Sequence, residues 1–201
     1  MDPSRNRARP LRHLLSAAIA ALLLQPAIAA ANGTDPEAAR AEARGIVKSF
    51  AGRLQAALQQ AIAEQGFQHA IGVCRLEAPR IAAGLKQESG WTVGRTALRL
   101  RNPANAPDAW ERRVLETFRA RGMAGEDFKD VEEIAVIAAD GKRKLRYMKA
   151  IPTGQICTAC HGSDIDPDLA ATIREAYPQD RATGFAPGDL RGAFTLSRPI
   201  D

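Results

Sequence analysis

The sequence predicts an α+β fold, an antiparallel β-sheet flanked by helices, with a long helix near the N-terminus. Helical periodicity extends from residue 36 to about residue 85. Further along, the turn dipeptide Asp140-Gly141 lies between two strand-like segments, residues 131–139 and 142–151. Strands paired as hairpins, with helices before and between them, are typical of this fold class.

Residues 36–65 are expected to form one amphipathic helix. Thr34 or Asp35 can cap its first turn, and Gly66 is expected to end it. The apolar residues at helical spacing form one face of this helix: Val47, Phe50, Leu54, Leu58, Ala61 and Ile62. A short helix is expected to follow, and Pro79 is expected to open another helix.

The remaining elements alternate between strands and helices. A strand is expected at residues 91–100 and a helix at residues 107–121. The second hairpin arm is densely basic over residues 142–149, which predicts an exposed, edge-like strand or a docking patch for an acidic redox partner. A helix at residues 168–176 and a strand at residues 192–198 complete the chain.

The amino terminus has the pattern of a secretory signal peptide. Four arginines precede an apolar run at residues 14–24, and cleavage sites follow after Ala29 or Ala31. The run is shorter than the roughly 20 apolar residues of a membrane-spanning helix. We expect residues 1–31 to be removed and residues 32–201 to form one soluble periplasmic domain.

The net charge does not indicate a nucleic-acid-binding protein. The formal net charge of the whole chain is +5. The expected signal peptide carries four arginines and one aspartate, so the remaining chain carries only +2. Part of the basic character therefore belongs to the targeting segment.

A CxxCH motif carries the clearest chemical signal. Its residues are Cys157, Cys160 and His161. This spacing is the attachment pattern of a c-type haem, in which both thiols bond to one edge of the porphyrin and the histidine binds iron. Such haem attachment occurs outside the bacterial cytoplasm, in agreement with the expected signal peptide. We therefore expect one covalent haem c with His161 as an axial ligand.

Three other chemical roles use a pair of cysteines with this spacing. A zinc site would combine it with the distant Cys74, but the adjacent Cys160 and His161 reach one tetrahedral ion poorly. A thioredoxin-like dithiol would need a parallel βαβ context, which the sequence does not show. A plain disulfide would leave His161 without a role.

Candidates for the second axial ligand are His69, Cys74, Met123 and Met148. His69 and Cys74 are separated by roughly 140° around a helix, so both cannot face one iron. Cys74 is the odd cysteine of an expected exported protein, which favours a committed role, although a buried inert thiol is the simple alternative. The residues alone leave the choice open.

Three arginines, Arg95, Arg99 and Arg101, share parity in the strand expected at residues 91–100 and just beyond it. Alternation along a strand would point them to the same side. Such a row can bind haem propionates or an acidic partner. An ordinary solvent-exposed face of the strand would show the same pattern.

Several segments together resemble a known family. They are residues 70–79, residues 99–111, the haem motif, residues 177–185 and residues 188–193. In this order they resemble the exported c-type haem domain of formerly unknown function that is typified by an orphan cyanobacterial cytochrome c. The resemblance spans nearly all of the expected mature chain.

The resemblance implies a PAS-like fold with a single haem c. It also implies an unusual pair of iron ligands, His161 of the motif and a thiolate from Cys74. A low-potential electron carrier or a redox or gas sensor is then expected, working with a redox partner protein or a separate signalling partner. The alternative is an enzyme that oxidises sulfur compounds at a cysteine-ligated haem, and a PAS-like interaction module with a structural haem is a third possibility.

Overall fold

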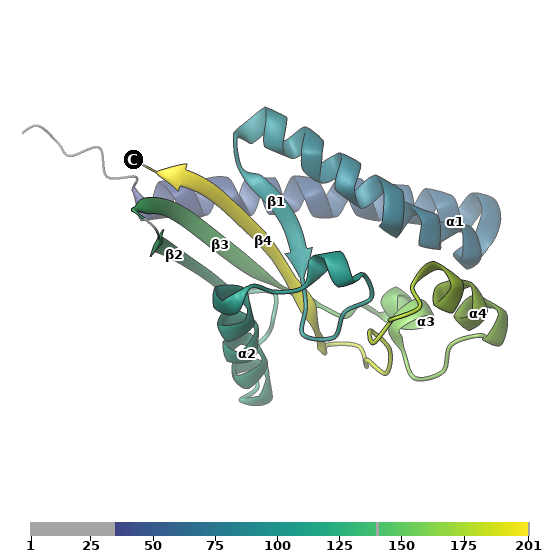
Figure 1. The fold of residues 1–201 in the computed structure, drawn as a ribbon. Helices are drawn as coiled ribbons and strands as arrows, with labels where there is room; N and C mark the ends of the chain where they lie inside the picture. The colour runs from purple at the N-terminus through teal and green to yellow at the C-terminus, as the bar shows by residue number, and fades with distance from the viewer. Residues whose placement is uncertain (1–34, 140, 201) are drawn as a thin grey trace, which may run out of the picture. The chain divides into compact units, whose positions relative to one another are not determined.

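A computed structural model describes residues 35–139 and 141–200, so the expected signal peptide lies outside the described residues. The elements are α1 (Pro36–Ser89), β1 (Thr92–Thr96), the 3₁₀ turn η1 (Pro103–Asn105), α2 (Ala109–Met123), β2 (Glu132–Ala139), β3 (Lys142–Pro152), the 3₁₀ turn η2 (Gln155–Cys157), α3 (Thr158–His161), α4 (Pro167–Ala176) and β4 (Leu190–Ile200). The predicted α+β fold with a long N-terminal helix is confirmed (Figure 1). Within the described residues, no helix is both long and apolar enough to cross a membrane.

α1 is a helical hairpin. Asp35 caps its start by accepting a hydrogen bond from the Glu37 amide at 2.9 Å, as one of the predicted caps. Gly66 has φ 80° and ψ −178°, which stops the first limb where predicted, and the second limb returns along it (Figure 1). The ion pair between Arg53 and Glu88 joins the two limbs.

The prediction that Pro79 opens a new helix is wrong, because the second limb continues through it to Ser89. Proline removes one backbone donor from a helix interior, which weakens the helix at this point. The apolar side of the limb compensates, because Ala78 and Leu85 are buried against the first limb and the sheet.

The sheet has the strand order β1-β4-β3-β2, and every neighbouring pair is antiparallel. The predicted β2–β3 hairpin is confirmed, and Gly141 takes the positive φ of 70° that its turn requires. The prediction that the basic β3 lies at an edge is wrong, because β4 and β2 pair with its two sides.

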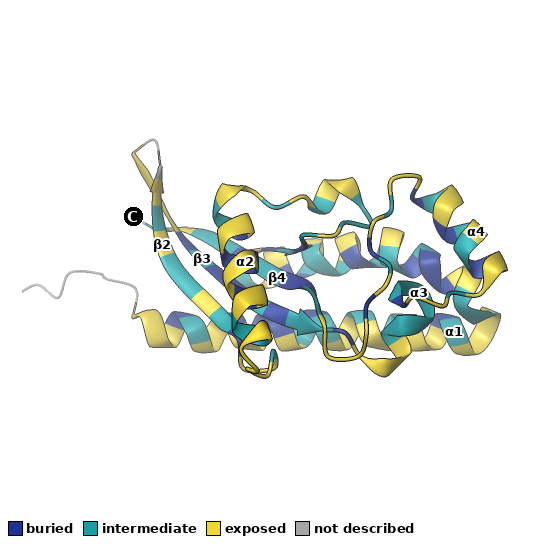
Figure 2. Ribbon diagram, turned by 90° about the horizontal axis from the view of Figure 1, so that it is seen from below, coloured by how far each residue is buried: buried dark blue, intermediate teal, exposed yellow. Residues whose placement is uncertain are grey.

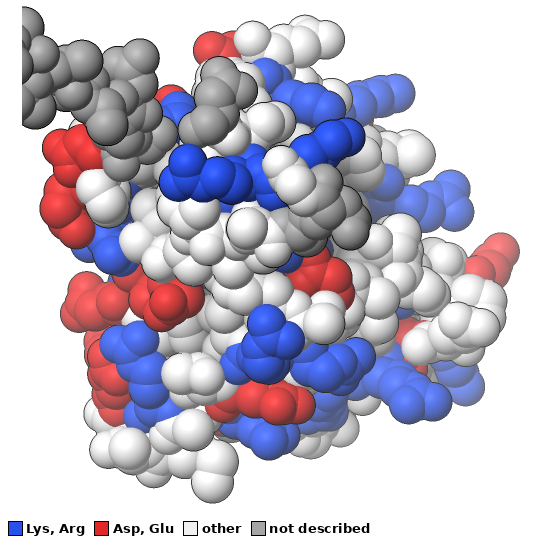
Figure 3. Space-filling view, turned by 60° about the vertical axis from the view of Figure 1, so that its left-hand side comes forward, with Lys and Arg blue, Asp and Glu red and all other residues white. Residues whose placement is uncertain are grey.

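Two features let a basic strand occupy the middle of the sheet. The side chains of Lys142, Arg143 and Lys144 lie at the exposed end of the hairpin. Figure 3 shows lysine and arginine side chains gathered on this side of the molecule. Further along, Arg146 pairs with Asp108 at 2.6 Å and with Glu111 at 2.9 Å, so its charge is compensated by α2.

Two of the core clusters pack on opposite faces of the sheet. On one face the α1 hairpin packs against Trp91, Tyr147 and Leu196. On the other face α2 packs against Met148 and Ala193, and its outer side is exposed (Figure 2). Neighbouring residues of β3 thus serve opposite layers, as strand alternation requires.

A buried carboxylate connects α1 to the sheet. Glu132, with 7% of its side chain exposed, accepts hydrogen bonds from Arg40 at 3.0 Å, Arg44 at 2.7 Å and the Tyr147 hydroxyl at 2.7 Å. Burial opposes ionisation, but these donors outweigh it and lower the pKa of Glu132 to about 2. The negative charge on Glu132 therefore stabilises the folded state.

We expect Glu132→Gln to lower the free energy of unfolding by about 2 kcal/mol at pH 7, because charge-assisted hydrogen bonds to two arginines are lost. The pKa in the folded state is below the ordinary 4.5, so this stability is present above pH 4.5 and is lost as the pH falls towards 2. The difference from wild type should shrink over that range in urea unfolding followed by circular dichroism. Glu133→Gln, at an exposed position of the same strand, is the matched control, and an equal effect of both variants would contradict the assignment.

Candidate functional site

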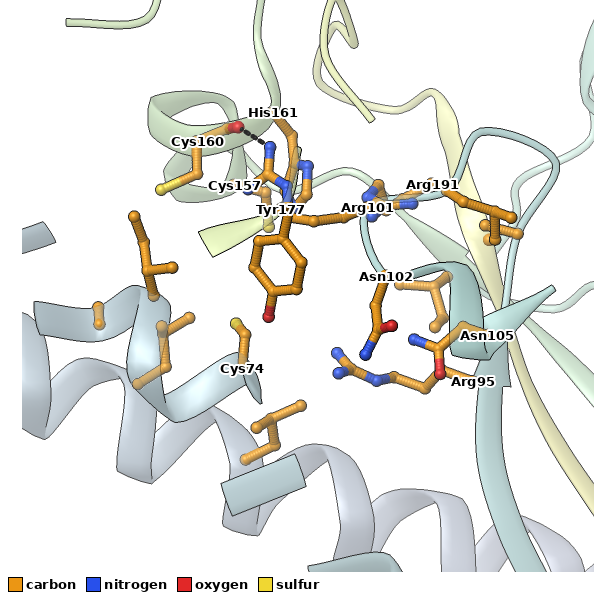
Figure 4. A pocket seen from close by; sticks show the side chains of 18 of the residues that line it. Cys74, Arg95, Arg101, Asn102, Asn105, Cys157, Cys160, His161, Tyr177 and Arg191 are labelled. Atoms are coloured by element: carbon orange, nitrogen blue, oxygen red, sulfur yellow. Dashed lines mark hydrogen bonds between the residues drawn. The ribbon is translucent and has the colours of Figure 1, made fainter. Parts of the chain in front are cut away.

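A cavity of about 230 Å³ lies beside the α1 hairpin, at the end of the sheet where η2 and α3 are found. The close-up in Figure 4 shows side chains reaching it from helix, strand and loop. The wall formed by the two limbs of α1 is apolar, with Leu54, Leu58, Ile62, Phe67, Ala70 and Ile71. Because the chain reverses direction at Gly66, residues of both limbs line the same side of the cavity.

The sulfur and imidazole groups predicted from the sequence line this one cavity. Cys157, Cys160 and His161 reach it from η2 and α3, and Cys74 reaches it from the second limb of α1 (Figure 4). All three cysteines are free thiols, so the plain disulfide is not formed. In residues 35–139 and 141–200, no group of three or more His, Cys, Asp and Glu side chains is arranged to hold a metal ion.

The other candidates for the second axial ligand do not line this cavity. His69 is exposed on α1, and Met123 is 83% exposed at the end of α2. Met148 is fully buried between the sheet and α2. Of the four residues considered, only Cys74 shares the cavity with His161.

His161 is held as a neutral imidazole with a defined tautomer. Its Nδ1 lies 2.6 Å from the Ala182 carbonyl oxygen. A carbonyl only accepts, so Nδ1 carries the proton and Nε2 keeps a free lone pair. Burial lowers the pKa of His161 to about 3, assisted by the positive charges of Arg191 and Arg101. A neutral, oriented imidazole is the form that binds a metal.

The loop after α4 positions this histidine. The Gly184 amide donates to the Gly162 carbonyl at 2.7 Å, and the Phe185 amide donates to the His161 carbonyl at 2.9 Å. On its other side, the Arg181 amide donates to the Leu100 carbonyl at 2.7 Å. The loop is thus hydrogen-bonded to both the end of α3 and the segment after β1.

Arg101 joins the same three segments with its side chain. It donates to the Cys160 carbonyl at 2.5 Å (Figure 4) and lies 3.0 Å from the Asp180 carboxylate. Both partners of this ion pair are nearly buried, with 11% and 6% of their side chains exposed. Sequence reasoning named Arg101 but missed Asp180, because no local pattern links residues so far apart in the chain.

Positive charge exceeds negative charge around the cavity. Arg95, Arg101 and Arg191 line it, and Asp180 already pairs with Arg101. Arg191 makes one hydrogen bond, from Nη1 to the Arg99 carbonyl at 3.3 Å, and its buried Nε has no partner among the described residues. Burial lowers the pKa of Arg191 to about 10, with further lowering by Arg101 and Arg95. The cavity thus offers unpaired donors to an anion.

Arg99 departs from the predicted row. β1 ends at Thr96, earlier than expected, so strand alternation no longer determines where Arg99 points. Its guanidinium lies over the Phe185 ring, 4.3 Å from the centroid, and it does not line this cavity. The prediction that all three arginines share one side is therefore wrong for Arg99.

Tyr177 is a further lining residue that sequence reasoning did not single out as functional. It is buried at the end of α4, and Figure 4 shows its hydroxyl directed towards the Cys74 sulfur. Burial raises the pKa of Tyr177, and the nearby Cys74 raises it further. The hydroxyl thus stays protonated and able to donate near Cys74.

These features together suit a flat apolar group with anionic substituents. The apolar wall accepts its body, and the unpartnered Nε of Arg191 can receive a carboxylate. Thiols and an imidazole with a free Nε2 can supply covalent bonds and a metal ligand.

Comparison with known proteins gives a family and a fold. Residues 24–199 match the Tll0287-like family. Among solved structures, the crystal structure of the cyanobacterial heme-protein Tll0287 superposes with a TM-score of 0.62 at 23% sequence identity. The match covers 84% of this chain and 98% of that chain. No curated protein matches the sequence.

We expect Arg101→Gln to lower the free energy of unfolding by about 3–5 kcal/mol, because the buried Asp180 carboxylate is left without its cation. Urea unfolding measures this loss. In the Arg101→Gln background, Asp180→Asn should recover part of it, and Arg75→Gln, at an exposed position of α1, should change little. The pairing would be contradicted if the double variant were less stable than Arg101→Gln alone.

Proposed function

The chain belongs to the Tll0287-like family, and from this we propose that it is an exported monohaem c-type cytochrome with a haem in the cavity beside α1. One observation carries the proposal: Cys157, Cys160, His161 and Cys74 line a single cavity. The structural relative is itself described as a heme-protein. The Nε of Arg191, without a partner among the described residues, and the apolar helix wall support the same ligand.

Each group then has a distinct role. Cys157 and Cys160 would anchor the haem covalently, and Nε2 of His161 would bind its iron, while the Ala182 carbonyl accepts the hydrogen bond from Nδ1. Arg95 and Arg191 compensate the propionate charges. Cys74, which lines the same cavity, would supply a second protein ligand to the iron. The haem supplies a one-electron ferric/ferrous couple to this arrangement.

A thiolate at Cys74 favours ferric over ferrous iron, because its negative charge stabilises the more positive metal. The protein would then work at low potential, as an electron carrier for a redox partner. The basic end of the β2–β3 hairpin lies at the opposite end of the sheet from α3 (Figure 1), so an acidic partner docked there would be far from the cavity. Electron exchange is better placed at Ile156, which is 49% exposed and next to Cys157.

A redox or gas sensor is the second candidate. Cys74 lies between two residues that weaken a helix, Gly66 with its positive φ and Pro79 with its missing donor. Such a position favours release of the thiol when the iron is reduced. A sensor of this kind would need a separate signalling partner.

Electron paramagnetic resonance tests the ligand pair. We expect ferric wild type to give a low-spin signal with thiolate character, and Cys74→Ala to lose that signature. His69→Ala, at an exposed position of the same limb, should leave the spectrum unchanged. A thiolate signal that persists in Cys74→Ala would disprove this ligand.

The covalent bonds are tested on the same preparations. Haem should stay with the wild-type chain through denaturing electrophoresis and be lost from the variant in which Cys157 and Cys160 are both alanine. Haem loss from wild type would disprove the c-type attachment.

Carbon monoxide separates carrier from sensor. With both axial positions filled, we expect no shift of the Soret band when the reduced protein is exposed to the gas at neutral pH. Cys74→Ala opens one position and should bind the gas, which provides the positive control. A shift in wild type would instead favour the sensor.

A further inference from the structure

A second cavity, of about 430 Å³, lies between α2 and the segments that flank β1 and β4. It is separate from the cavity beside α1 but shares Arg191 and Gly192 with it. Its apolar lining comes from Leu98, Leu115, Met123, Phe128, Phe185 and Leu190. Apart from these two shared residues, the lining of the second cavity has no role in the proposed haem site.

The charged lining of the second cavity is unbalanced. Three arginines, Arg99, Arg119 and Arg191, face one carboxylate, Asp189. That carboxylate accepts a hydrogen bond from the Ala186 amide at 2.7 Å, which fixes it within its own loop. Two positive charges therefore remain without a carboxylate among the lining residues.

Two of these arginines have donors to spare. No ion pair or hydrogen bond of the Arg119 side chain is found in the described part of the chain, and this side chain is exposed on α2. In Arg99, the side-chain hydrogen bond found in the described part of the chain is from Nε to the Arg181 carbonyl at 3.2 Å, so its Nη groups keep donors for a ligand. Arg191 lines both cavities and is already assigned to a propionate in the proposed haem site. A planar guanidinium matches a carboxylate in shape and charge.

We propose that this second cavity binds a small monocarboxylate with an apolar body, such as a short-chain or aromatic acid. The arginines bind the carboxylate, and the leucine and phenylalanine side chains enclose the hydrocarbon part. A neutral molecule of the same shape lacks the charge that the arginines require, so the site selects the anion.

The two cavities meet at Arg191 and Gly192, which line both of them. A Cβ atom at Gly192 would lie 2.4 Å from the Thr96 carbonyl oxygen, so the backbones of β4 and β1 touch there without a side chain between them. Arg99 and Arg191 both lie over the Phe185 ring, at 4.3 and 5.3 Å from its centroid. The Phe185 and His161 rings are nearly perpendicular, with their centroids 6.4 Å apart.

A carboxylate bound in the second cavity would therefore add negative charge close to His161. This second part of the inference rests on the proposed haem function. Neutralising a cation near the iron favours the ferric state, so the bound acid should lower the reduction potential. The first part, binding of the acid, does not depend on haem.

Calorimetric titration of the full-length protein tests binding with four probes: benzoate, hexanoate, benzamide and hexanamide. At least one carboxylate should bind saturably, and its amide should bind about tenfold more weakly or not at all. Arg119→Gln should lower the affinity for the carboxylate about tenfold. Arg112→Gln is the matched control, because Arg112 is exposed on the same helix and does not line the cavity.

Absence of binding by both carboxylates would overturn the proposal, and so would equal binding of an acid and its amide or unchanged affinity in Arg119→Gln. The reduction potential, measured with and without the bound carboxylate, tests the coupling. A fall in wild type supports it, and an unchanged potential with the acid bound overturns it. If the protein held no haem, the proposed function would fail while the calorimetric result would still decide the binding site.

Discussion

The ion pair between Arg101 and Asp180 is the contact on which the site depends. Through it the segment after β1, the end of α3 and the loop after α4 are held together, and Arg101 also satisfies the Cys160 carbonyl at the end of a short helix. Without that loop the Ala182 carbonyl would not meet Nδ1 of His161. The orientation of the imidazole thus follows from a charge pair that does not touch it.

The same architecture concentrates positive charge around both cavities. Arg191 lines the two of them, and Arg95 adds to the charge of the first. Buried cations without carboxylate partners cost stability in an isolated fold. An anionic ligand would relieve that cost, so the proposed haem and the proposed carboxylate would both be favoured by the same arrangement of arginines.

Most local sequence signals predicted the elements correctly, although Pro79 did not open a new helix. Gly66 ended the first helix limb, and Asp140-Gly141 marked the hairpin, because both depend on the conformation of a few neighbouring residues. Signals whose meaning depends on the whole sheet led to wrong predictions for the position of β3 and for the direction of Arg99. The basic β3 can lie in the middle of the sheet because Asp108 and Glu111, at the start of α2, compensate the charge of Arg146. Arg99 does not point with Arg95 and Arg101 because β1 already ends at Thr96. These compensations come from elements distant in the sequence.

The sequence by itself determined the fold class, the CxxCH motif and a short set of candidates for the second axial ligand. It did so because spacing and periodicity are local properties of the chain. The tertiary structure decided which candidate shares a cavity with His161, since the α1 hairpin carries Cys74 there and leaves His69 in solvent. It also decided that Asp180, Tyr177 and Arg191 belong to the site, because only folding brings such residues to one place.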